Sequence, residues 1–213
     1  MKVLHLAGVL GRIDWLEWTE SAAAPRHDVL CVSSLFDSDQ VPSAPPQQLR
    51  DWCQRRRLAT VLCSGAGHNL DRGNARRSAN SWIAELRTDY VVTEGGAFCS
   101  EGWLIEAVPA GALPLRVGQV CVTPRPPAGS RCAFTRGLGD QGDPALRTLV
   151  RSDGAPSTLM CGSVHQPLAR HEVMGWTLVI NPGVDLVAST PSWALLDLKS
   201  GILSFGARRQ SLA

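Results

Sequence analysis

Residues 1–18, MKVLHLAGVLGRIDWLEW, contain the pattern that decides the fold. An apolar run of strand length over residues 3–6 ends at small residues, and a helical pattern opening with Asp14 follows Gly11. Further strand-like runs lie at 29–32, 60–63 and 90–93, and the helical patterns between them lie at 46–57 and 75–87. Strands that alternate with helices favour a parallel sheet covered by helices.

The C-terminal third of the sequence has a different pattern. Strand-like runs at 158–161, 177–180 and 193–198 follow one another with little room for helices, which favours antiparallel pairing. Before them, residues 124–142 are rich in Pro, Gly and Arg and predict an exposed loop. Asp143 and Pro144 have the order of an N-cap and a first helical residue, so we expect a helix to about Ser152.

Length and composition predict one soluble α/β domain over residues 1–213. The hydrophobic share of 44% fits a globular protein, and the net charge of +2 gives no overall attraction to nucleic acid or to an anionic membrane. Arg55, Arg56 and Arg57 form the one basic run. No apolar run approaches the ~18 residues of a membrane-spanning helix, so we expect no membrane partner.

The seven cysteines predict neither a zinc ribbon nor a disulfide framework. They form no Cys-x-x-Cys pair, their number is odd, and no secretory leader precedes the first strand. A reducing compartment follows from this pattern, and we expect the protein to be cytoplasmic.

Five segments, each of which contains the end of a strand-like run, carry a family resemblance. They are LHLAGVLGRIDWLEW (4–18), DVLCVSSLFDS (28–38), VLCSGAGHNLDRGNARRSANSWIAEL (61–86), QVCVTPRPPAG (119–129) and CGSVHQP (161–167). In this order they resemble the motif neighbourhoods of calcineurin-like metallophosphoesterases, small bacterial members in particular. The resemblance implies an αββα sandwich of two mixed sheets flanked by helices, with two divalent metals at the strand ends.

Most metal-ligand positions of that family fall here on residues that cannot bind a metal. By the resemblance, these lost ligand positions are Gly8, Leu10, Ser34 or Leu35, Gly67, Pro124 or Arg125, and Ser163. His165 keeps one ligand position as a vestige, and His68 takes the place of the general-acid histidine. One imidazole without a carboxylate cannot hold a dinuclear centre, so we expect no bound cofactor.

These losses favour a catalytically inactive metallophosphoesterase-like protein that acts as a binding or scaffold subunit of a larger protein assembly. Trp15, Trp18 and Trp52, or the 124–142 segment, are candidates for its interface, although tryptophans at helical spacing also fit a core.

Two alternatives remain open. One is a phosphoesterase or phosphodiesterase with a rearranged or metal-poor site, in which His68 and His165 serve as acid and base and Arg12 and Arg125 stabilise the charge. The other is a nucleic-acid-binding module that acts through its arginines.

Overall fold

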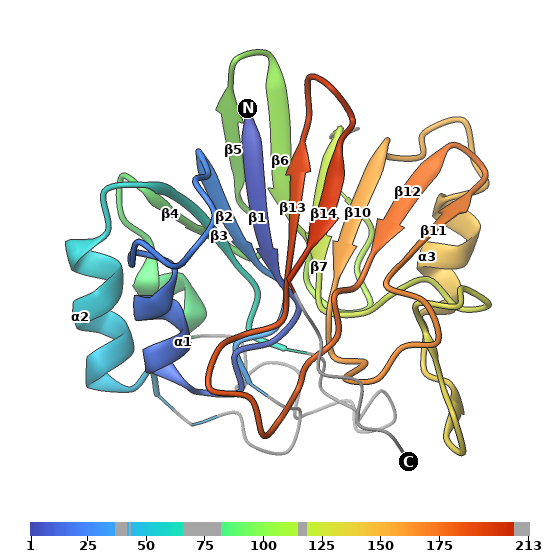
Figure 1. Cartoon of the computed structure of the whole chain (residues 1–213). Helices are drawn as coiled ribbons and strands as arrows, with labels where there is room; N and C mark the ends of the chain where they lie inside the picture. The colour runs from blue at the N-terminus through green and yellow to red at the C-terminus, as the bar shows by residue number, and fades with distance from the viewer. Residues whose placement is uncertain (37–41, 43, 66–81, 115–118, 207–213) are drawn as a thin grey trace.

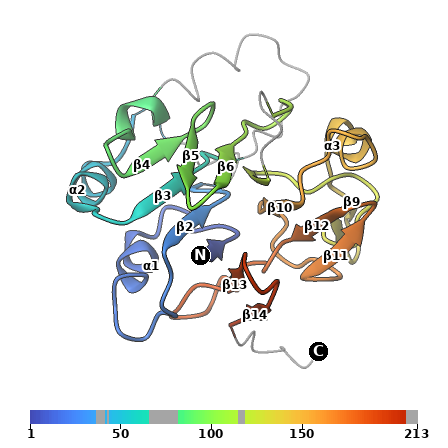
Figure 2. The same ribbon diagram turned by 90° about the horizontal axis from the view of Figure 1, so that it is seen from above.

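Two six-stranded sheets pack face to face, and short helices cover their outer faces, in the computed structural model (Figures 1 and 2). The structure describes residues 1–36, 42, 44–65, 82–114 and 119–206. The helices are α1 (Ile13–Trp18), α2 (Gln47–Arg55), the 3-10 helix η2 (Ile83–Leu86) and α3 (Pro144–Leu149). Figure 2 shows α1 and α2 outside one sheet and α3 outside the other. None of the helices in the described ranges is long and apolar enough to cross a membrane.

The first sheet has the strand order β14-β13-β1-β2-β3-β4. Its strands are β1 (Lys2–Leu6), β2 (Val29–Val32), β3 (Ala59–Leu62), β4 (Val91–Thr93), β13 (Trp193–Asp197) and β14 (Leu203–Phe205). Strands β1 to β4 are parallel, whereas β13 pairs antiparallel with both β1 and β14. The sheet is therefore mixed, as the alternating N-terminal pattern and the C-terminal run of strands together predict.

The second sheet has the strand order β11-β12-β10-β7-β6-β5. Its strands are β5 (Ala97–Ser100), β6 (Trp103–Ala107), β7 (Val120–Thr123), β10 (Thr158–Cys161), β11 (His171–Met174) and β12 (Thr177–Ile180). The four inner strands are parallel, and the two edge strands β5 and β11 are antiparallel to their neighbours. The prediction of antiparallel pairing in the C-terminal third is wrong for β10 and β12, which are parallel neighbours. The chain returns through β11, which lies between them in sequence but pairs with the outer side of β12.

Three apolar layers hold this four-layer arrangement together. One face of β1, which carries Leu4 and Leu6, packs against α1, α2 and η2. The opposite face, which carries Val3, packs between the two sheets. The alternation follows from the two-residue period of a strand. A third, smaller layer joins Leu146 of α3 to the second sheet. The sandwich of two mixed sheets flanked by helices is thus confirmed.

Residues 124–142 differ from the uniformly exposed loop that their composition predicts. Pro126, Ala128 and Cys132 are buried, because the backbones of Pro126 and Ala128 bond to Asp143 and the Cys132 side chain joins the α3 layer. The longest exposed stretch is 136–140, in the ribbon of β8 (Phe134–Thr135) and β9 (Gly139–Asp140), and β8 itself is half-buried.

The helices are shorter than their sequence patterns. Helix α3 begins as predicted, since the Asp143 carboxylate accepts hydrogen bonds from the Ala145 and Leu146 amides, but it ends at Leu149. Of the helix expected over 75–87, residues up to 81 lie outside the described ranges, and Ile83–Leu86 form one 3-10 turn.

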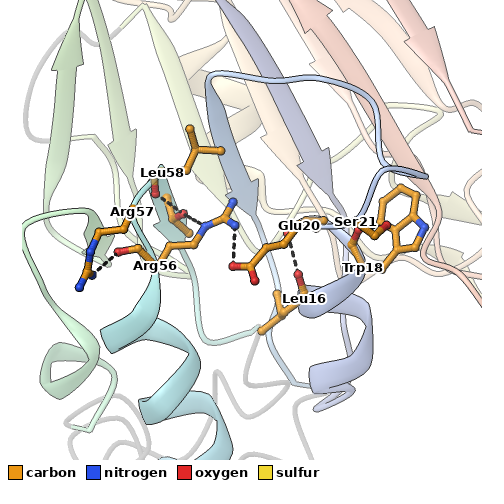
Figure 3. Close-up of polar contacts among 9 residues, drawn as sticks. Leu16, Trp18, Glu20, Ser21, Arg56, Arg57 and Leu58 are labelled. Carbon is orange, nitrogen blue, oxygen red and sulfur yellow. Dashed lines mark hydrogen bonds and ion pairs between the residues drawn. The ribbon is translucent and has the colours of Figure 1, made fainter.

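A buried arginine fastens α2 to the end of α1 (Figure 3). Arg56 is 4% exposed; its Nη1 donates to Glu20 Oε1 at 2.9 Å, its Nε donates to Thr60 Oγ1 at 3.1 Å, and it lies 5.1 Å from the Trp52 ring centroid. Trp52 itself is fully buried, as is Trp15 on α1. The candidacy of these two tryptophans as interface anchors is therefore wrong, because both pack in the layer between helices and sheet.

Candidate functional site

The carboxyl ends of the parallel strands from both sheets meet at one edge of the sandwich, which we call the carboxyl edge. The turn after β10 touches the turn after β1 so closely that a Cβ atom on Gly162 would overlap the Ala7 carbonyl oxygen. The ends of β3 and β7 also meet, since Cys63 Sγ donates to the Val122 carbonyl at 3.4 Å. Ligands in open α/β sheets bind at such strand ends, so the chemistry of this edge decides the function.

The described positions that the family resemblance singles out lie together at the carboxyl edge. The Val9 amide donates to the Ser34 carbonyl at 3.0 Å, which joins the segment containing Gly8 and Leu10 to the end of β2. On the second sheet, the Gly162 amide donates to Pro124 and the Val184 amide donates to the His165 carbonyl at 2.8 Å. Gly67 and His68 lie outside the described residues.

Apolar side chains are buried just beyond the ends of β1 and β2. Ala7, Val9, Leu35 and Val184 belong to the same buried layer as α1 and α2, and we call these four residues the apolar plug. A Cβ atom on Gly8 would lie 3.2 Å from Val184 Cγ2, 3.7 Å from the Ser34 carbonyl oxygen and 3.8 Å from Leu10 Cδ2. A side chain at position 8 would thus crowd the Val184 methyl group, which would have to move by a few tenths of an ångström.

The described residues at the carboxyl edge do not fit a pair of divalent cations. Two-metal phosphoesterase chemistry needs carboxylate and imidazole ligands that hold two ions roughly 3.5–4 Å apart. Position 8 has no side chain, Leu10 has no donor atom, and the Ser34 hydroxyl donates to the Phe36 carbonyl at 2.9 Å. Within the described ranges, no group of three or more His, Cys, Asp or Glu residues could hold a metal ion.

The backbone at the same edge is nevertheless strained at two of these positions. Leu10 has a φ of 51° and Ser163 a φ of 60°, in the left-handed region that residues with a Cβ atom rarely adopt. The Ser163 hydroxyl is also buried, with no hydrogen-bond partner among the described residues. Strained residues of this kind cluster at binding and catalytic sites.

A buried histidine and serine join β1 to the end of β2. His5 Nε2 lies 2.9 Å from Ser33 Oγ, and that hydroxyl donates to the Ala7 carbonyl at 3.0 Å. Full burial lowers the pKa of His5 to about 3, so its imidazole is neutral at physiological pH. The pair stabilises the strand ends and supplies no exposed acid or base.

Glu94 is a buried carboxylate that the sequence motifs did not identify. It follows β4, and its Oε1 accepts hydrogen bonds from the Ser64 amide at 2.8 Å and the Ser64 hydroxyl at 2.7 Å. Burial raises the pKa of Glu94, and the bonds from Ser64 oppose that rise. The position of Glu94 directly after a parallel strand could have identified it in the sequence, because polar side chains at such positions lie at the same edge as those of the neighbouring strands.

Arg12, a candidate for stabilising a phosphate, has its guanidinium engaged by the protein itself. Its Nη2 donates to Asp14 Oδ2 at 2.6 Å, its Nη1 donates to the Ala188 carbonyl at 3.0 Å, and it stacks 4.4 Å from the Trp15 ring centroid. This pairing lowers the pKa of Asp14. Arg125, the other candidate, is half-buried beyond the end of β7.

Comparison with known proteins bears on the fold. No protein-family model and no curated protein matches the sequence. Among solved structures, an archaeal phosphodiesterase, described in a structural and functional characterisation, is similar with a TM-score of 0.53 and 11% sequence identity. The alignment covers 97% of this chain and 99% of that protein. The chain has a metallophosphoesterase-like fold. At this identity the likeness extends to the arrangement of the sheets and not to the chemistry of the edge.

Proposed function

We propose that this metallophosphoesterase-like protein has lost two-metal phosphodiester hydrolysis and serves as a binding or scaffold subunit within a larger protein assembly. The observation that supports the proposal is the apolar plug, in which Val184 packs against Gly8 at the edge where catalysis would take place. A cation there would lose its water and meet aliphatic carbon in place of charged ligands.

The well-packed remainder of the structure supports a binding function that depends on the folded protein. The three apolar layers, the Asp143 cap and the buried Arg56 contacts all specify one arrangement of strands and helices. A sequence in which local and global features agree specifies its fold, whereas function depends on the site. A stable sandwich with apolar residues at its carboxyl edge fits a protein that functions by binding through its surface.

Metal content and hydrolysis together test this proposal. The full chain is purified from its host without chelators, its metals are counted by mass spectrometry, and bis-p-nitrophenyl phosphate hydrolysis is measured with added Mn²⁺. We expect no stoichiometric transition metal, and no turnover that distinguishes the protein from its His68→Ala and His165→Ala variants. About two bound metals per chain, or hydrolysis that either variant abolishes, would contradict the proposal.

A phosphoesterase with a rearranged site is the second candidate function. The left-handed backbone at Leu10 and Ser163 favours it, because strain of that kind persists where a ligand must be held. The same assay separates the two candidates, since a rearranged enzyme loses turnover on substitution of its acid or base and a binding subunit has none to lose.

A further inference from the structure

Both sheets end in an edge strand at the same end of the sandwich. These strands are β11 in the second sheet and β14 in the first, and Figure 2 shows them near each other at the rim of the molecule. Arg170 and His171 connect them, because the guanidinium carbon lies 4.3 Å and the imidazole centroid 5.6 Å from the centroid of the Phe205 ring. Strand β11 is therefore held in a fixed position at this end.

The outer side of β11 leaves two residues without backbone hydrogen bonds. The Asn181 amide donates to the Arg170 carbonyl at 2.9 Å, so every second residue of this ladder, counted from Arg170, bonds to β12. The N–H and C=O groups of His171 and Val173 alternate with these residues and point away from β12. No described residue bonds to any of these four groups.

The opposite end of the sandwich shows how such an edge is covered. Val91 in β4 faces away from β3; its amide donates to the Thr88 hydroxyl at 3.1 Å, and its carbonyl accepts from the Thr88 amide at 3.2 Å. Natural edge strands otherwise avoid pairing through lysine, proline or a bulge. Strand β11 has neither lysine nor proline, its register is continuous, and Val173 within it is exposed. Its edge is therefore open to a further strand.

Three exposed apolar side chains accompany the open edge. Leu168 is 46% exposed, Val173 67% and Trp176 91%. Leu168 and Trp176 each lie four residues from Glu172, so a two-fold axis at Glu172 brings Leu168 of one copy toward Trp176 of the other. The same axis places His171 opposite Val173, where outward N–H and C=O groups bond in an antiparallel pair.

From these observations we infer that β11 pairs antiparallel with β11 of a second copy of this chain, so that the two second sheets form one continuous sheet. The symmetric placement of the apolar side chains about Glu172 favours a second copy over an unrelated strand. The net charge of +2 opposes association only weakly. Both strands are already ordered, so pairing costs less conformational entropy than the ordering of a free peptide. The inference goes beyond the proposed function, because it holds whether or not the protein hydrolyses phosphodiesters.

Glu172 lies on the proposed axis and provides a test of the register. Its carboxylate accepts a hydrogen bond from the Arg131 amide at 2.6 Å, and in the dimer it faces the same group of the second copy. Like charges directly opposite each other destabilise a strand pair. We therefore expect Glu172→Gln, which keeps an acceptor for the Arg131 amide, to tighten the dimer.

Sedimentation equilibrium of the purified full chain tests the inference with two variants at one position. Val173→Pro removes the outward N–H group but no hydrogen bond between β11 and β12, whereas Val173→Thr keeps that group. We expect the wild type to dimerise and Val173→Pro to weaken the dimer about tenfold or more, because the interface loses one donor from each copy. Val173→Thr should weaken it much less. Circular dichroism checks that both variants fold.

Hydrogen–deuterium exchange of the wild type gives a second measurement that needs no variant. The amides of His171 and Val173 should exchange more slowly as the protein concentration rises, since pairing protects them. The Cys99 amide is the control. It faces outward from β5, because the Ala107 amide donates to the Gly96 carbonyl and the pairing alternates from there, and its exchange should not depend on concentration.

Four outcomes would overturn the inference. They are a chain that stays monomeric up to its highest soluble concentration, a dimer that Val173→Pro leaves unchanged, concentration-dependent protection at Cys99 in place of Val173, and a dimer that Glu172→Gln weakens.

Discussion

Gly8→Asp is the substitution that examines the carboxyl edge most directly. It restores a carboxylate at a lost ligand position, but the three atoms nearest to the new Cβ are two methyl carbons, from Val184 and Leu10, and the Ser34 carbonyl oxygen. None of these donates a hydrogen bond, and Gly8 itself is buried, so we expect the carboxylate to lose its hydration without compensation. Such an uncompensated charge costs about 3–5 kcal/mol, a large part of the ~5–15 kcal/mol stability of a typical domain.

Gly8→Asn is the matched control, because it fills nearly the same volume without charge. The shared cost of crowding Val184 should be about 1–3 kcal/mol in both variants. The excess cost of Asp over Asn therefore measures the buried charge, and an excess of about 3 kcal/mol corresponds to a folded-state pKa about two units above the ordinary value of about 3.9. Because that pKa is raised, the excess is absent below about pH 4 and grows as the pH rises through the folded-state value.

Urea unfolding followed by circular dichroism at pH 5 and pH 8, with and without MnCl₂, measures these quantities. We expect the gap between Asp and Asn to widen from pH 5 to pH 8 and Mn²⁺ to leave it unchanged. If the two variants agree within about 0.5 kcal/mol at pH 8, the edge is open to water and the reasoning fails. Selective stabilisation of the Asp variant by Mn²⁺ would show that the edge still accepts a cation.

Three further substitutions probe other parts of the structure, each by chemical unfolding. Arg56→Ala should cost about 2–4 kcal/mol because it removes a buried guanidinium, whereas the exposed neighbour in Arg57→Ala should change stability by less than about 0.5 kcal/mol; equal effects would contradict the assigned burial. Asp143→Ala should cost about 0.5–2 kcal/mol through loss of the α3 cap, and an unchanged midpoint would argue against the cap. Because burial raises the pKa of Glu94, the wild type gains stability when Glu94 is protonated and loses it as the pH rises through the folded-state pKa. Glu94→Gln should remove this slope while keeping an acceptor for Ser64, and a parallel pH profile would refute the assignment.

The strand pattern predicted most of the fold. The apolar runs at 29–32, 158–161 and 177–180 coincide with β2, β10 and β12, because these strands are buried on both faces and their hydrophobicity is continuous. The antiparallel strands β5 and β11 and the C-terminal β14 were missed. Each lies at the edge of its sheet, carries polar residues and depends on its neighbour for pairing, which sequence pattern does not report.

The candidate site was predictable in place but not in chemistry. Strand ends located Gly8, Ser163 and His165 at one edge, since parallel strands end together. The partners of Arg12 were not predictable, because the Ala188 carbonyl that it holds is 176 positions away in the sequence. The packing of Val184 against Gly8 depends on the same kind of long-range contact, which a single sequence does not report.

The position of β1 in the first sheet also has a consequence for folding in the cell. β1 lies between β2 and β13, and Leu4 pairs with Leu195, so one side of this strand stays unpaired until almost the whole chain has been synthesised. At roughly 5–20 residues per second, the delay for about 190 residues is on the order of 10–40 s. During that time the nascent chain exposes an apolar strand edge that other chains could pair with. We therefore expect recovery of soluble protein to depend on intact β13, and truncation before Trp193 to cause aggregation instead of partial folding.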